Sequence, residues 1–205
     1  MNNEKTKTDI RQKQIKETAM QIIMEESLDA LTIASIAEKI GITKSNIYRH
    51  FSSKDAILEN ILIEMNATLQ NIISEGNSME SAKDSLHHIF RRHLEMLEEY
   101  KGTPLTILTD KNYRNNAEIF KLMTKTVTGY IKSIEKLLLK GIKNNEFKTE
   151  INVSSVALYH LGLIQAAILQ WQVSNGKISV KSRGEEFLQI YMNGISNSML
   201  NQKVG

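Results

Sequence analysis

The sequence predicts an all-α protein, on two observations. Apolar residues recur at helical spacing along most of its 205 residues. A single proline and ten glycines leave few points at which a long helix must stop. We expect about nine helices in two domains, which are a three-helix domain at 1–54 and a larger helical domain at 55–205.

The first helix is expected at about 9–26, after a polar arm at 1–8 that we expect to be disordered. One face of this helix carries the apolar residues Ile15, Ala19, Ile22 and Ile23. The polar start lacks the apolar core of a signal peptide, and the chain has no cysteine. We therefore expect a cytoplasmic protein without disulfides, a thiolate nucleophile or a zinc finger.

Residues 32–54, TIASIAEKIGITKSNIYRHFSSK, are typical of two short helices joined by a tight turn. Thr32 and Thr43 are placed to cap these helices, and Gly41 can end the first of them at positive φ. Each threonine lies within a pair of apolar residues at the spacing of a hydrophobic staple, namely Leu31 with Ile36 and Ile42 with Ile47. This arrangement is that of a helix-turn-helix DNA reader.

The charge pattern of this stretch also suits DNA. No acidic residue lies between Glu38 and Asp55, whereas four bases do, which are Lys39, Lys44, Arg49 and Lys54. Such a surface suits a phosphate backbone, although a solvated helix face has the same composition. The net charge is only +3, and residues 1–60 hold nine bases and nine acids. DNA affinity must therefore depend on where the bases are placed.

Residues 10–60 resemble the N-terminal DNA reader of the TetR family of bacterial transcription regulators. The residues that carry this resemblance are Thr32, Ile36-Ala37, Gly41, Thr43, Tyr48-Arg49-His50-Phe51, Lys54-Asp55 and Leu58. Ser27 departs from the pattern, because the family often has glycine there, and we expect a modest adjustment of that loop. The rest of the chain resembles the family only in its length and helical pattern.

The resemblance implies a DNA-contacting surface on double-stranded DNA. The residues expected to contact phosphates are Thr32, Thr43, Tyr48, His50 and Lys54, and those expected to reach base edges are Lys44, Ser45 and Asn46. Arg49 is expected on the same outward surface. Lysine can donate to guanine and asparagine can pair with adenine, so the sequence leaves open which residue reads a base.

A long helix is expected to begin at Lys54, capped by Ser52 or Ser53, and to end near Gly76-Asn77. Its apolar stripe is longer than the small reader can cover, so it should link the two domains. Further helices are expected at about 79–100, from Thr103-Pro104, at about 117–144, at about 151–175 and at about 183–200.

Residues 151–175 contain no Asp, Glu, Lys or Arg. A transmembrane helix of this length must be considered, but His160 and several Ser and Gln residues favour burial on more than one face, so no membrane partner is expected. The resemblance implies that this helix and the one at about 183–200 pair with a second subunit. A homodimer of this kind would bind a palindromic operator.

The resemblance also implies a small-molecule pocket in the larger domain. The candidate lining residues are Phe90, His93, Leu97, Tyr113, Phe120, Met123, Tyr130, Tyr159, His160, Gln165 and Trp171. The alternative for each is an ordinary core position. A pocket of this composition would take a small apolar effector with a few polar groups, and a ligand that favours the non-DNA state would lower operator affinity.

We therefore predict a homodimeric bacterial regulator, a repressor released from its operator by a small apolar ligand. The alternative is a helix-turn-helix protein with an architectural or division-control role and no inducer. His87, His88 and His93 do not lie at the three- and four-residue steps that share a helix face, so no metal or other cofactor is expected. No nucleophile–base motif or phosphate-binding glycine loop indicates an enzyme.

Overall fold

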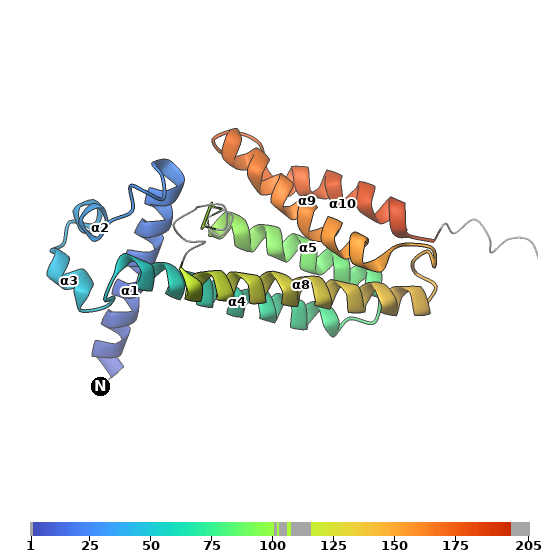
Figure 1. Ribbon diagram of the computed structural model, residues 1–205, viewed down its shortest axis with the longest axis horizontal. Helices are drawn as coiled ribbons and strands as arrows, with labels where there is room; N and C mark the ends of the chain where they lie inside the picture. The colour runs from blue at the N-terminus through green and yellow to red at the C-terminus, as the bar shows by residue number, and fades with distance from the viewer. Residues whose placement is uncertain (1, 101, 103–105, 108–115, 198–205) are drawn as a thin grey trace, which may run out of the picture. The chain divides into compact units, whose positions relative to one another are not determined.

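The computed structural model describes residues 2–100, 102, 106–107 and 116–197, with side chains from residue 7 onward. The described residues form eight named helices and no strand beyond an isolated bridge between Phe147 and Ser196. The helices are α1 (Asn2–Glu25), α2 (Ile33–Ile40), α3 (Lys44–Tyr48), α4 (Lys54–Asn77), α5 (Ala82–Glu99), α8 (Ala117–Lys143), α9 (Val153–Val173) and α10 (Val180–Ile195) (Figure 1). The predicted all-α class is confirmed.

The helices belong to two compact units. The N-terminal unit contains residues 1–67 and 99–123, and the C-terminal unit contains residues 68–98 and 124–205. Both α4 and α8 pass from the first unit into the second. The predicted domain boundary between residues 54 and 55 stays a prediction, as does its grouping of helices.

The core of the N-terminal unit is built from helices that follow one another closely in the sequence. The predicted apolar face of α1 is buried, and α1 packs on α2, which packs on α3. The other buried residues of this core come from α2, α3 and α4 and from the segment between α3 and α4, and include Ile36, Ala37, Ile47, Phe51, Ile57, Leu58, Ile61 and Leu62. Three helices and the start of α4 therefore share one small core.

The prediction of a disordered arm at 1–8 was wrong, because α1 begins at Asn2. Nothing between residues 2 and 25 stops a helix, since the segment has no proline or glycine. Glu4, Lys5 and Lys7 are good helix formers. The lack of apolar residues at 2–8 did not argue against a helix, because an apolar stripe is a sign of burial and not of helix formation.

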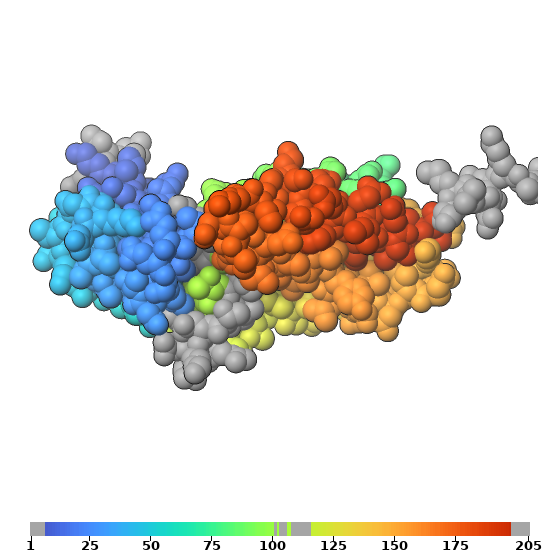
Figure 2. Space-filling model, turned by 90° about the horizontal axis from the view of Figure 1, so that it is seen from above, coloured from blue at the N-terminus to red at the C-terminus, as the bar shows by residue number. Residues whose placement is uncertain are grey.

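The core of the C-terminal unit joins distant helices. Its buried side chains come from α5, the later turns of α8, α9 and α10, and include Leu86, Phe90, Tyr130, Ile134, Ile164, Ile168, Leu188 and Met192. α10 lies close to α5, since a Cβ atom added to Gly184 would be 2.1 Å from Leu94 Cδ1. Figure 2 shows α9 and α10, in orange to red, forming one continuous surface of this unit.

Several predicted helix ends moved by a few residues. α10 begins at Val180 rather than Arg183, because the hydroxyl of Ser179 accepts from the backbone of Ser182. It ends at Ile195, since the backbone at Ser196 is extended. α5 begins at Ala82 rather than Met79. The short helix expected from Thr103-Pro104 lies outside the described residues, apart from the helical Thr106 and Ile107.

The charge-free stretch forms α9, capped as predicted by Asn152, whose Oδ1 accepts from the backbone of Ser155 at 2.9 Å. By length and composition alone this helix could cross a membrane. Core helices of globular proteins pass the same test, and one face of α9 is buried within the unit through Ala157, His160, Leu161, Ile164, Ala167 and Ile168.

Candidate nucleic-acid interface and candidate ligand site

The start of α2 is fixed by a reciprocal pair of hydrogen bonds. The hydroxyl of Thr32 accepts from the backbone of Ser35 at 2.9 Å, and the hydroxyl of Ser35 accepts from the backbone of Thr32 at 2.9 Å. This is a capping box in which serine takes the place usually held by glutamate or glutamine. The cap predicted for Thr32 is confirmed, and the part played by Ser35 was missed.

The turn after α2 depends on Gly41. Its φ of 77° lies in the left-handed region, as predicted, where a side chain would be strained. The next cap is also confirmed, because the hydroxyl of Thr43 accepts from the backbone of Asn46 at 3.3 Å. Ser27, which replaces the family's usual glycine, needs no positive φ; its hydroxyl accepts from the backbone of Ala30 at 3.1 Å.

α3 separates a buried side from an open one. Ile47 is fully buried, and Phe51 just beyond the helix is 6% exposed. The open side carries the predicted contact residues, of which Lys44, Ser45, Tyr48 and Arg49 are exposed and Asn46 and His50 are half-buried. Thr32 and Thr43 are exposed, and Lys54 is half-buried at the start of α4. All nine predicted residues lie in α3, in the two residues that follow it, or at the starts of α2, α3 and α4.

The bases near α3 differ in whether an acid already engages them. Within the described residues, no ion pair involves Lys44, Arg49 or Lys54. Lys39, by contrast, lies 2.7 Å from Glu25 and 3.5 Å from Glu26. The hydrogen bond that Lys39 donates to the Glu25 carboxylate raises the pKa of the Lys39 amine. Three bases are therefore available for an anion, while Lys39 fastens α2 to the end of α1.

Four of the predicted ligand-site residues meet in the C-terminal core. Phe90 and His93 come from α5, Tyr130 from α8 and His160 from α9, and all four are buried. The ring centroids are 4.8 Å apart for His93 and Tyr130 and 5.2 Å apart for Phe90 and His160. We call these four residues the aromatic cluster. Leu97 is buried on the same helix as Phe90 and His93.

Burial sets the protonation of the aromatic cluster. Desolvation lowers the pKa of His93 to about 3 and that of His160 to about 4. It raises the pKa of Tyr130 well above its ordinary value. At neutral pH both imidazoles are therefore uncharged, and the Tyr130 phenol is protonated. The phenol oxygen lies 2.9 Å from His160 Nδ1.

Two buried nitrogens of the aromatic cluster have no hydrogen-bond partner among the described residues, namely Nδ1 of His93 and Nε2 of His160. The backbone of Leu86 acts against burial by raising the pKa of His160, but Nε2 makes no hydrogen bond with it. A buried polar atom without a partner typically costs about 1–3 kcal/mol. Such atoms are suited to meet a polar group on a bound molecule.

Tyr191 of α10 was not predicted as part of this site, although it also packs there. Its ring centroid is 5.5 Å from that of His160, and its hydroxyl donates to the carbonyl of Val156 at 3.3 Å. Tyr191 lies in an apolar stripe of α10, four residues after Phe187. This stripe could have predicted that Tyr191 is buried. It gave no indication that the Tyr191 hydroxyl bonds to a residue of another helix.

The other predicted ligand-site residues do not join the aromatic cluster. Phe120 is 45% exposed and Tyr159 is 65% exposed. Gln165 and Trp171 are half-buried, and Met123 is buried within the N-terminal unit. Tyr113 lies outside the described residues.

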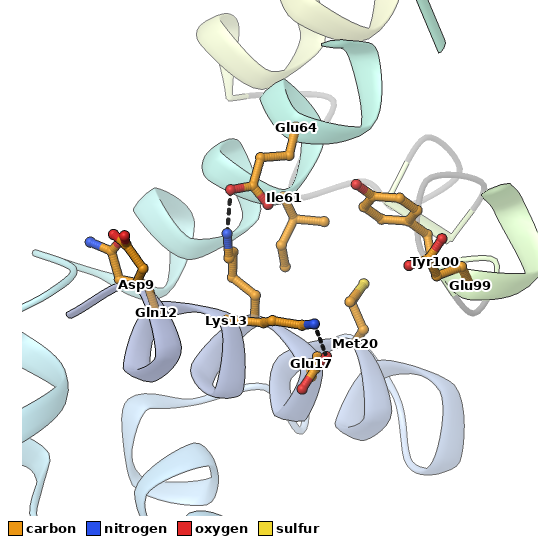
Figure 3. A pocket seen from close by; sticks show the side chains of 10 residues that line it. Asp9, Gln12, Lys13, Glu17, Met20, Ile61, Glu64, Glu99 and Tyr100 are labelled. Atoms are coloured by element: carbon orange, nitrogen blue, oxygen red, sulfur yellow. Dashed lines mark hydrogen bonds and ion pairs between the residues drawn. The ribbon is translucent and has the colours of Figure 1, made fainter. Parts of the chain in front are cut away.

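The N-terminal unit contains a hollow of about 390 Å³ that the sequence did not predict. Figure 3 shows it between α1, α4 and the segment at Glu99 and Tyr100. Lys16 of α1 forms one wall, and its amine is ion-paired with Glu64 of α4. Lys16 is a charged residue next to Ile15 on the apolar face of α1, and nothing in the helical spacing indicated that its side chain would be buried. No group of three or more metal-ligating side chains occurs in the described part of the chain.

Comparison with known families covers most of the chain. Residues 15–61 match the family described as "Bacterial regulatory proteins, tetR family". Residues 62–194 match the family described as "YsiA-like protein, C-terminal region". The first match covers α2, α3 and the parts of α1 and α4 that pack on them.

Two relatives are similar along almost their whole length. The fatty acid metabolism regulator protein of Bacillus subtilis is 23% identical over 186 residues, which cover 90% of this chain and 95% of that protein. The repressor KstR2 of Mycolicibacterium smegmatis is 22% identical over 193 residues, which cover 92% of each.

Two solved structures share the fold. That of the ketosteroid transcriptional regulator KstR2 of Mycobacterium tuberculosis has a TM-score of 0.80 at 20% identity, covering 92% of this chain and 96% of that one. That of FadR from Bacillus subtilis in complex with stearoyl-CoA has a TM-score of 0.71 at 21% identity, covering 89% and 98%.

Proposed function

The chain belongs to the TetR family of bacterial regulatory proteins, and we propose that it is a homodimeric repressor released from a palindromic operator by a small apolar ligand. Its family and relatives are transcription regulators rather than enzymes. The observation that carries the DNA-binding part is the open side of α3, where Lys44 and Arg49 are exposed and have no acidic partner in the described residues.

The proposed operator contacts divide by chemistry. Thr32, Thr43, Tyr48, His50 and Lys54 hold phosphates, joined by Arg49, while Lys44, Ser45 and Asn46 face base edges. Phosphate contacts fix the position of a reader on DNA, and base contacts give its sequence preference. The buried Ile47 and Phe51 support this proposal, because they hold α3 with its polar side outward.

The proposed dimer uses α9 and α10. Several large apolar side chains of these helices are exposed in the single chain, namely Leu158, Tyr159, Leu169, Val173 and Ile190. Gly162 and Gly194 add open positions, since a Cβ atom on either would meet nothing within 4 Å. An exposed apolar face of this kind is typical of a protein–protein interface. A two-fold dimer presents two copies of α3 to half-sites of a palindrome.

The proposed effector is a long-chain acyl-CoA thioester, whose acyl chain is the apolar group that the C-terminal unit would hold and whose CoA part is polar. One relative is named as a fatty acid metabolism regulator, and a structure with the same fold holds stearoyl-CoA. The aromatic cluster supports an apolar ligand with a carbonyl group. When the uncharged His160 accepts from Tyr130 through Nδ1, its proton lies on Nε2. Nε2 has no partner among the described residues and can donate to a ligand carbonyl. No cofactor takes part, and the protein acts in the cytoplasm.

The proposal is tested by selecting bound sequences from a random DNA pool with the purified chain. The expected result is one enriched palindrome with half-sites about one helical turn or more apart. Stearoyl-CoA, titrated against that duplex, should then release the protein, with stearic acid and free CoA as controls for the two halves of the ligand. Salt-sensitive binding with no enriched motif would instead support the architectural role.

A further inference from the structure

Asn116, the residue that precedes α8, joins the first turns of two helices. Its Oδ1 accepts from the backbone of Ile119 at 3.2 Å, which caps α8. Its Nδ2 donates to Oδ2 of Asp55 in the first turn of α4 at 3.3 Å. The two ends of one amide group therefore hold the starts of α8 and α4 together within the N-terminal unit.

The two joined helices are those that lead out of this unit. α4 continues past Ala67 and α8 continues past Met123 into the C-terminal unit. α4 also begins at Lys54, directly before Asp55, and Lys54 is a proposed phosphate contact. The hydrogen bond between Asn116 and Asp55 thus connects the turn that carries the proposed phosphate contact Lys54 to the start of a helix that runs on to Tyr130.

We infer that Asn116 is a positioning residue through which operator binding and the C-terminal unit affect each other. This inference rests on the proposed function and names the route of its regulation. DNA that holds Lys54 fixes the first turn of α4, and the Asn116 amide makes the first turn of α8 follow it. Coupling between two sites is reciprocal, so a ligand that shifts α8 acts back on Lys54 through the same bond.

A second polar link in the N-terminal unit provides a contrast. Lys16 of α1 is ion-paired with Glu64 of α4 beside the hollow in Figure 3. α1 lies wholly within the N-terminal unit. The Lys16–Glu64 pair therefore joins α4 only to a helix that stays within the N-terminal unit. It forms no link between α4 and α8.

The test uses hydrogen exchange in α8, measured on the full chain at saturating operator duplex from the selection experiment. In the wild type, we expect operator binding to change exchange in residues 117–130 by at least threefold. Asn116→Asp keeps a good N-cap but sets a carboxylate against Asp55, and it should remove most of this change. Asn152→Asp is the matched control, since Asn152 caps α9 and has no side-chain partner on another helix among the described residues.

The exchanged pair, Asp55→Asn with Asn116→Asp, restores an amide facing a carboxylate and should restore the wild-type response. Lys16→Met should lower stability and leave the response intact. A response in Asn116→Asp equal to that of the wild type would overturn the inference, as would unchanged α8 exchange in an operator-bound wild type. A wild type that binds no duplex would instead refute the proposed function itself.

Discussion

The reader at α2 and α3 and the aromatic cluster differ in how far along the chain their contacts reach. In the reader, each cap joins residues three positions apart, as for Thr32 and Ser35. In the aromatic cluster, the bond between Tyr130 and His160 spans thirty positions. The reader is therefore specified by short sequence patterns, whereas the cluster exists only after three helices have packed.

The close packing of the C-terminal unit should give the largest effect. A Cβ atom at Gly141 would lie 2.1 Å from the buried ring of Phe147, so Gly141→Ala should lower the free energy of unfolding by about 1–3 kcal/mol. Gly129, on the same helix, would meet nothing within 4 Å. Gly129→Ala should raise stability by about 0.5–1 kcal/mol, and equal effects in urea unfolding would contradict this packing.

Removing one hydroxyl from the aromatic cluster should come next. Tyr130→Phe leaves Nδ1 of His160 buried without its partner, and it should cost about 1–3 kcal/mol in urea unfolding. Tyr48→Phe, measured without DNA, is the control, since Tyr48 is 55% exposed and the change should alter stability by less than about 0.5 kcal/mol. Similar losses in both variants would show that the buried bond has no special weight.

A substitution in the reader should lower the free energy of unfolding by less, because the stabilising contacts of the reader are local. Thr32→Ala removes the hydroxyl that accepts from the backbone of Ser35, which is one half of the capping box, and should cost about 1 kcal/mol. Thr32→Ser keeps the hydroxyl and should stay close to wild type. If the two variants unfold at the same urea concentration, the cap is not what fixes the start of α2.

The smallest effect concerns pH. Glu146 accepts from the backbones of Ala82 and Lys83 and from the Ser81 hydroxyl, and although burial opposes it, these bonds lower the pKa of the Glu146 carboxyl. Its stabilisation is therefore present above the ordinary pKa and is lost as pH falls through the lowered one. The stability difference between wild type and Glu146→Gln should shrink between pH 6 and about pH 3. A constant difference would contradict this assignment.

The same comparison explains what the sequence could and could not predict. The caps at Thr32 and Thr43, the turn at Gly41 and the burial of Ile47 follow from local patterns, and the structure confirms them. The helical start of α1 was missed, because burial and helix formation are separate properties and only the first leaves an apolar stripe.

Apart from Ser35 in the capping box, the missed side-chain partners are long-range. Lys16 meets Glu64, Asn116 meets Asp55 and Tyr191 packs on His160 only when their helices are in place. Helical spacing predicts which face of a helix is buried but not which residue of another helix it meets. For the same reason the predicted ligand set contained both the buried Tyr130 and the exposed Tyr159.

The central claim is that Arg49 and Lys54, which form no ion pair within the described residues, contact operator phosphates, and salt dependence tests it most directly. The slope of log affinity against log salt should fall by about 0.9 when Lys54→Ala removes one phosphate contact, with a similar loss of affinity for every operator variant. Lys39→Ala should leave the slope unchanged, because Lys39 is already paired with Glu25. Equal slopes for wild type and Lys54→Ala would contradict the claim.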